Sequence, residues 1–170
     1  MKKTLRLALA LLATSFLPLA SAGEGSFPAK NPVLKYVAPE KWTTEVDKKD
    51  GSVSINSPDG RVSVNFGEVP TEASMELFEQ MLPEMAKVLT DATITDKAKE
   101  HTEDGLTGYT ATYAGKIEDK PAIVIFVLFK GGKERAILGN VVVSDPGTLA
   151  KEVNEAIGAF MKSLKGAAQK

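Results

Sequence analysis

The sequence predicts an α+β fold in which helices cover both faces of a mostly antiparallel sheet, an α/β/α sandwich. Apolar and polar residues alternate over 53–56 and 62–66, as is typical of strands with one buried face. Residues 75–89 carry apolar side chains at spacings of three and four, which indicates an amphipathic helix. Two nearly continuous apolar runs, 122–129 and 136–143, predict strands buried on both faces.

The chain begins with the pattern of an export signal. Basic residues precede an apolar run, Leu7 to Leu19, and Ala20-Ser21-Ala22 forms a small-x-small cleavage site, so we expect a signal peptide over 1–22 and cleavage before Gly23. The apolar run is shorter than the roughly 20 residues that a spanning helix needs. We therefore expect a periplasmic or secreted protein with no stable membrane span after cleavage.

A single domain is expected over 33–164, between a flexible leader, 23–32, and a disordered tail, 165–170. The chain has no cysteine, so the fold must be stable without disulfides, and thiolate metal sites are excluded. Loss of the three basic signal residues changes the formal net charge from −1 to −4. This balance, without a basic patch, argues against nucleic acid as a partner.

The first strands are predicted as an antiparallel meander. Thr43 to Val46 is a short strand, and the turn Lys48 to Gly51 leads to the alternating residues 53–56. Pro58-Asp59-Gly60 then turns the chain into the strand 62–66.

The helix that follows is predicted to begin at Thr71, whose hydroxyl would cap it. Pro83 lies inside the pattern and lacks an N–H donor, so we expect a kink or two abutting segments there. Its apolar stripe consists of Met75, Phe78, Leu82, Met85 and Leu89.

Four more strands are predicted after this helix. Residues 93–101 are charged and alternate weakly, as expected for an edge strand, and 107–114 follow a turn. The two apolar runs, 122–129 and 136–143, should be central neighbours joined at Gly131-Gly132.

The final element is predicted to be a helix with Asp145 as its N-cap and Pro146 at its first position. Its apolar stripe consists of Leu149, Val153, Ala156, Ile157, Phe160 and Leu164. The predicted order is therefore β-β-β-α-β-β-β-β-α.

Four residues are candidates for a ligand or partner surface. Trp42, Tyr109 and Tyr113 either line a cleft for a hydrophobic or sugar-like ligand or pack in the core. Asn140 lies in an apolar run and needs a partner in backbone, water or ligand, because an unpaired buried amide costs about 1–3 kcal/mol. We expect a β-bulge at Gly139-Asn140 to redirect it.

The sequence contains no motif that indicates a particular reaction. His101 is the sole histidine, lies in a charged segment, and is expected to be exposed, and no glycine-framed serine is present. The acidic residues near turns match no metal motif, and no phosphate-binding loop occurs. We therefore assign no catalytic, metal or cofactor-binding residue and expect no cofactor.

Several segments together resemble the PsbP-like superfamily. They are Val37-Ala38-Pro39 followed by Trp42, the segment Ser57 to Arg61 that opens a Val-x-Val strand, and Gly108-Tyr109 before the two apolar strands and the closing helix. That superfamily includes the extrinsic photosystem II subunit, the Ran-binding Mog protein and many small exported bacterial proteins. The resemblance implies an α/β/α sandwich and a non-catalytic binding or accessory role. It carries over no catalytic residue and does not imply a photosynthetic function.

The leading functional hypothesis is an exported, non-catalytic binding or accessory protein of the bacterial cell envelope. Its partner would be an unknown protein or a small hydrophobic ligand. One alternative is a hydrolase that uses carboxylate chemistry. Another is an envelope-stress protein that shields hydrophobic clients, suggested by Met81 and neighbouring apolar residues, which would require an exposed apolar patch.

Overall fold

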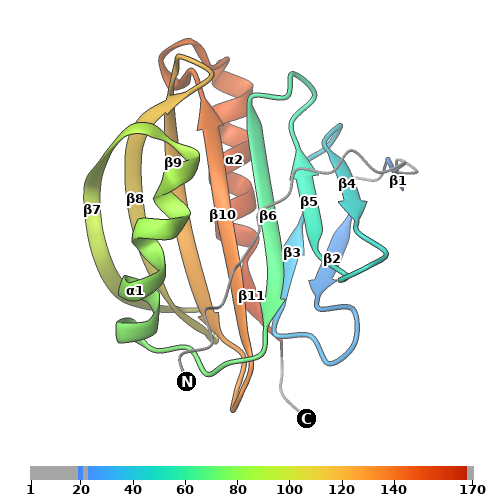
Figure 1. Ribbon diagram of the computed structural model, residues 1–170. Helices are drawn as coiled ribbons and strands as arrows, with labels where there is room; N and C mark the ends of the chain where they lie inside the picture. The colour runs from blue at the N-terminus through green and yellow to red at the C-terminus, as the bar shows by residue number, and fades with distance from the viewer. Residues whose placement is uncertain (1–18, 21–22, 168–170) are drawn as a thin grey trace.

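The computed structural model describes residues 19–20 and 23–167. Its large sheet is antiparallel and has the strand order β1-β4-β5-β6-β10-β9-β8-β7 (Figure 1). A smaller antiparallel sheet has the order β11-β3-β2. The large-sheet strands are β1 (Leu19–Ala20), β4 (Thr43–Val46), β5 (Val53–Asn56), β6 (Val62–Val69), β7 (Thr90–Glu103), β8 (Leu106–Ile117), β9 (Lys120–Lys130) and β10 (Ala136–Ser144). The others are β2 (Glu24–Phe27), β3 (Leu34–Val37), β11 (Lys165–Gly166), helices α1 (Met75–Met85) and α2 (Lys151–Ser163), and 3₁₀ turns η1 (Ala86–Val88) and η2 (Pro146–Thr148).

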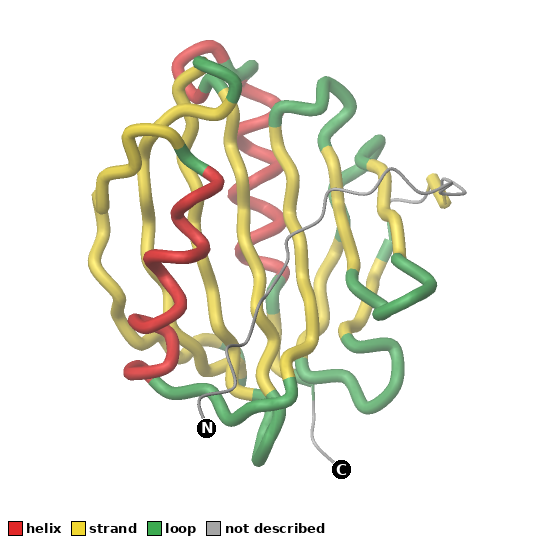
Figure 2. Tube along the Cα trace, viewed as in Figure 1, coloured by secondary structure: helices red, strands yellow, loops and turns green. Residues whose placement is uncertain are grey.

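The predicted α/β/α sandwich is wrong, because the described residues form two antiparallel sheets and helices cover only part of each face of the large one. On one face of the large sheet, α1 lies over the β8–β9 side only (Figures 1 and 2). On the opposite face, α2 shares the covering layer with the small sheet. The small sheet was not predicted because its strands have two to four residues, too few to show a hydrophobic period.

The small sheet is built from segments predicted to be irregular. Residues 24–27 of the predicted flexible leader form β2, and Lys165–Gly166 of the predicted tail form β11, so both predictions need correction. Packing and hydrogen bonding hold these two segments in the small sheet. Phe27 is buried, and the Ala167 N–H donates to the Val33 carbonyl at 2.9 Å. Within the predicted signal peptide, residues 1–18 and 21–22 lie outside the described residues.

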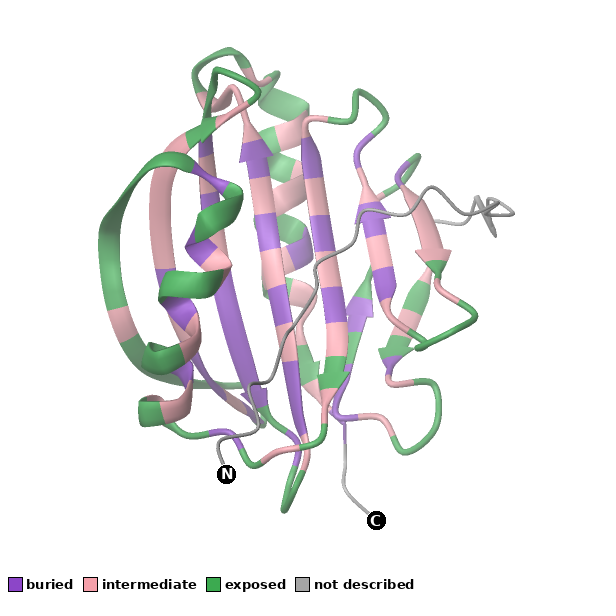
Figure 3. Cartoon of the chain, viewed as in Figure 1, coloured by how far each residue is buried: buried purple, intermediate pink, exposed green. Residues whose placement is uncertain are grey.

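The predicted strands of the large sheet are confirmed, several with longer bounds. The two apolar runs form β9 and β10, which are adjacent, antiparallel and near the middle of the sheet. Strand β7 lies at one edge of the large sheet, as predicted, and its residues are almost all exposed (Figure 3). Its charged side chains suit an edge, where they oppose pairing with other chains.

Helix α1 is confirmed, but its details differ from the prediction. Its N-cap is Ser74 rather than Thr71, and the Ser74 hydroxyl accepts a hydrogen bond from the Leu77 N–H at 3.1 Å. The helix continues through Pro83, and the change of structure comes at Ala86, where η1 begins.

Helix α2 begins later than predicted. Asp145 and Pro146 start the short turn η2 instead, with Asp145 in a left-handed conformation at φ 51°. The chain then straightens, and α2 starts at Lys151. Its predicted stripe does face the sheet, since Phe160 is fully buried and Val153 and Ile157 pack beside it. Among the described residues, no helix is long and apolar enough to cross a membrane.

The core consists of two clusters, one on each face of the large sheet. The cluster under α1 joins Phe78 and Leu82 to β8 and β9. The cluster on the opposite face joins Phe160 of α2 and Tyr36 of β3 to Phe66 of β6, with ring centroids 6.2–6.4 Å apart.

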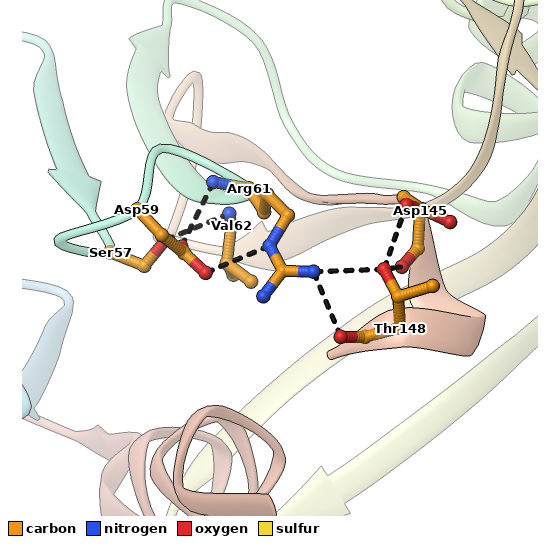
Figure 4. Close-up of polar contacts among 6 residues, drawn as sticks. All are labelled: Ser57, Asp59, Arg61, Val62, Asp145 and Thr148. Carbon is orange, nitrogen blue, oxygen red and sulfur yellow. Dashed lines mark hydrogen bonds and ion pairs between the residues drawn. The ribbon is translucent and has the colours of Figure 1, made fainter. Parts of the chain in front are cut away.

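Arg61 connects two turns at one end of the sheet (Figure 4). Its Nε donates to the Asp59 carboxylate at 2.8 Å, and its Nη1 donates to the carbonyl and the hydroxyl of Thr148, both at 2.9 Å. The buried Ser57 hydroxyl donates to Asp59 at 2.7 Å and accepts from the Val62 N–H at 3.0 Å. These contacts tie the β5–β6 turn to η2, ahead of α2.

This cluster should make stability depend on acidity. Hydrogen bonds from Ser57 and Arg61 lower the pKa of Asp59 from 3.8 to about 2. A depressed folded-state pKa means that the carboxylate stabilises the fold above pH 3.8 and that this contribution is lost as the pH falls toward 2. Because 35% of the Asp59 side chain is exposed, solvent screening limits the contribution to about 1 kcal/mol.

We therefore expect Asp59→Asn to be less stable than the parent at pH 5 by about 1 kcal/mol and nearly equal to it at pH 2. Urea unfolding of both proteins across this range measures the difference. A gap that stays the same at every pH would show that the Asp59 charge makes no contribution.

Candidate functional site

The four residues predicted for a ligand surface do not gather at one place. Trp42 is 3% exposed and lies in the core cluster on the α2 face. Tyr109 and Tyr113 lie on the α1 face, where Tyr109 stacks on Phe78 at 6.3 Å and Tyr113 meets Phe126 edge-on at 5.8 Å. The aromatic residues therefore serve as packing groups on two different faces.

Asn140 takes part in a polar row that crosses three strands on the α1 face. The Asn65 amide donates to Asn140 Oδ1 at 2.8 Å, and the Ser54 hydroxyl donates to Asn65 Oδ1 at 2.7 Å. Asn140 and Asn65 are direct cross-strand partners, as are Asn65 and Ser54. The predicted need of Asn140 for a hydrogen-bond partner is met by another strand.

The predicted bulge at Gly139-Asn140 is wrong, because the register of β10 with both neighbours is continuous. Gly139 is explained by close packing instead. A Cβ atom there would lie 2.8 Å from the Asn65 carbonyl oxygen and from the Phe66 ring. Glycine thus permits the regular pairing that places Asn140 opposite Asn65.

A groove is the strongest candidate for a binding site. It lies where β7, β8 and β9 face the last turn of α2, and its volume is about 300 Å³. Its apolar surface comes from the sheet and from the end of α2, where Met161 and Leu164 line it. The apolar residues from the sheet are Leu106, Ile125, Val127 and Phe129.

The rim of this groove is polar. Asp96, Lys99, His101 and Glu103 come from the exposed strand β7, and Thr110 comes from β8. Lys99 and Asp96 form an ion pair at 3.3 Å, with about half of each side chain exposed. The groove thus combines an apolar interior with charged and hydrogen-bonding groups along one edge.

His101 is exposed, as predicted, but it also lines this groove. Among the described residues, no hydrogen bond or ion pair joins its ring to Asp96 or Glu103. A nucleophilic mechanism needs a base held by an orienting partner. The arrangement therefore resembles a polar rim more than a catalytic pair. The described residues also contain no group of three His, Asp or Glu side chains placed to hold a metal ion.

The groove was missed at the sequence level because its apolar residues read as ordinary core. One signal was available in β8. Tyr109, Ala111 and Tyr113 face α1, so Thr110 and Thr112 must face the opposite side. Thr110 thus places a hydroxyl on an otherwise apolar part of that face, between Gly108 and the apolar strand β9. Only the position of α2 shows where the gap lies.

The large apolar side chains that are exposed lie on four separate elements. They are Val37 on β3, Val46 on β4, Val88 on η1 and Ile94 on β7. Met81, which suggested a client-binding surface, is only partly exposed on α1. This distribution gives the client-shielding hypothesis no support.

Comparison with known proteins finds a similarity to solved structures. No protein-family model and no curated protein matches the chain. A crystal structure from Bacteroides thetaiotaomicron VPI-5482 matches with a TM-score of 0.53 and 16% sequence identity, over 88% of this chain and 50% of that chain. The likeness is one of fold. The chain spans half the length of that protein, and at this identity nothing about activity carries over.

Proposed function

We propose that the chain is an exported, non-catalytic binding protein of the bacterial cell envelope that holds a small, largely apolar ligand in the groove between α2 and strands β7 to β9. The observation that carries this proposal is the groove itself, with its apolar interior and polar rim. Ligand sites are typically concave, mostly apolar and equipped with a few polar groups, with volumes upward of roughly 300 Å³. The groove, at about 300 Å³, fits a ligand at the small end of that range.

The polar rim suggests how a ligand would be oriented. An apolar body would contact Val127, Phe129 and Met161, and a polar end would lie beside Lys99, His101 and Thr110. Burial of apolar surface supplies affinity at about 25 cal/mol per Å². The rim groups supply orientation, because they hydrogen-bond or attract only the polar end.

The export part of the proposal rests on the basic and apolar pattern of the first 22 residues. Protein for the binding experiment is therefore isolated from the envelope fraction. Mass spectrometry should find a chain that begins at Gly23. A membrane-bound chain that retains Met1 would contradict export while leaving the groove open to test.

The groove is tested with N-phenyl-1-naphthylamine, a small neutral probe whose fluorescence rises in apolar surroundings. We expect saturable binding by the parent. Thr110→Phe places an aromatic ring in the groove, where it takes up space that the probe needs. Binding of the probe should therefore weaken by about tenfold or more, which corresponds to a loss of about 1.4 kcal/mol of binding free energy.

Thr102→Phe is the matched control. It adds the same side chain to the exposed strand β7 at a position that does not line the groove, so binding should stay at the parental level. Equal binding by the parent and Thr110→Phe, or an equal loss in both variants, would rule out the groove as the binding site.

A further inference from the structure

A second pocket lies on the other side of α2, against the small sheet. Its volume is about 610 Å³, and β2, β3, β11 and the end of α2 all contribute to it. Three lysines from three of these elements line it: Lys35 on β3, Lys162 on α2 and Lys165 on β11. Glu24 is its one acidic lining residue. A concentration of positive charge at one pocket is unusual for a chain whose formal net charge is −1.

These lysines are poorly neutralised by the protein itself. Among the described residues, Lys35 and Lys162 have no carboxylate oxygen within 4.0 Å. Lys165 lies 3.9 Å from Asp104, but both side chains are more than half exposed. An exposed pair of this kind is largely screened by solvent and neutralises the lysine little.

The sheet register places two of these charges directly opposite each other. Lys35 and Lys165 are cross-strand partners, and Ser26 is the partner of Lys35 on its other side. Like charges at directly opposed positions are destabilising. A bound anion would relieve this repulsion, and the Ser26 hydroxyl would add a hydrogen-bond donor in the same row.

We propose that this pocket binds the phosphate group of an organic phosphate, held by Lys35, Lys162 and Lys165. A phosphate monoester carries between one and a half and two negative charges near neutral pH and presents three strong acceptor oxygens. That chemistry matches three separate ammonium groups better than a carboxylate does, with its single charge and two oxygens. The pocket continues beyond the lysines to Val37 and Ala159, which leaves room for an organic body.

The purified protein is titrated with inorganic phosphate at low ionic strength, where surface charges are least screened. Backbone amide signals in nuclear magnetic resonance spectra should shift at residues 24–26, 35–37 and 162–165. Lys35→Gln and Lys162→Gln should each weaken binding by about tenfold, because each removes a charge-assisted hydrogen bond to the phosphate. Lys87→Gln is the control, because Lys87 lies on η1, is paired with Glu84 and lines no part of this pocket.

Stability separates a loss of binding from a loss of fold. Lys35→Gln removes the repulsion with Lys165, so it should unfold at the same or a higher temperature than the parent without phosphate. Thr110→Phe should bind phosphate like the parent, because Thr110 lines the groove and not this pocket. Parental phosphate affinity in both lysine variants, or no shifted signals in the parent, would overturn the proposal.

Two further probes identify the source of the phosphate. Glucose 6-phosphate represents a soluble ester, and vesicles with phosphatidic acid represent a lipid headgroup. Binding of either one, weakened by Lys35→Gln, supports the proposal and names the source. Binding of both probes without any effect of Lys35→Gln would overturn it.

Discussion

Val124→Asp is expected to be among the most destabilising single substitutions in this protein. Val124 lies on the central strand β9, is 0% exposed and packs in the cluster under α1. A carboxylate there would have no partner and little water, and the large mutational effects, above about 4 kcal/mol, come from changes of this kind. Since whole domains are stable by about 5–15 kcal/mol, chemical denaturation should show most of the stability lost at neutral pH.

The acidity of the solution adds a second readout. Burial raises the pKa of an introduced carboxyl, so the cost comes from the charged form, and the deficit should shrink as the pH falls below neutral. Val46→Asp is the matched control, because Val46 is 50% exposed on β4 and its replacement should change stability by no more than about 0.5 kcal/mol. Equal melting of Val124→Asp and Val46→Asp would mean that β9 is not a buried central strand.

Phe160→Ala should have the second largest effect, a loss of about 3–5 kcal/mol. Phe160 is 1% exposed on α2 and contacts the rings of Tyr36 on β3 and Phe66 on β6. It therefore joins the helix, the small sheet and the large sheet. Removal of the ring leaves a cavity at this junction.

Hydrogen exchange should locate the damage. In Phe160→Ala, amide protection should fall most in β2, β3 and β11, because the small sheet packs on this ring. Phe78→Ala is the counterpart on the other face, where Phe78 is 0% exposed and stacks on Tyr109, and it should expose α1 and β8 instead. A loss below about 1 kcal/mol in Phe160→Ala, or the same exchange pattern in both variants, would contradict this account.

The clearest success of sequence reasoning concerns the central strands. Residues 122–129 and 136–143 form adjacent central strands as predicted, but burial on both faces is reached only over part of β9, since alternate residues of β10, such as Leu138 and Val142, are half-buried. The period of two located β5 and β6 and the period of 3.6 located α1, because these periods reflect local geometry, whereas β7 was predicted from its charge. The helix starts were less well predicted, since Ser74 and Thr71 offer nearly the same hydroxyl cap.

The sequence by itself determined a cysteine-free chain, the order of its longer strands and helices, and which of their faces are apolar. Only the tertiary structure decided what covers those faces. The pairing of β11 with β3 joins residues at least 130 positions apart, and neither β11 nor β2 is long enough to show a period. The same holds for the two candidate sites. Met161 lines the groove with Val127, and Lys162 lines the lysine pocket with Lys35, because the end of α2 lies between the groove and the pocket. The position of α2 depends on contacts between residues distant in sequence.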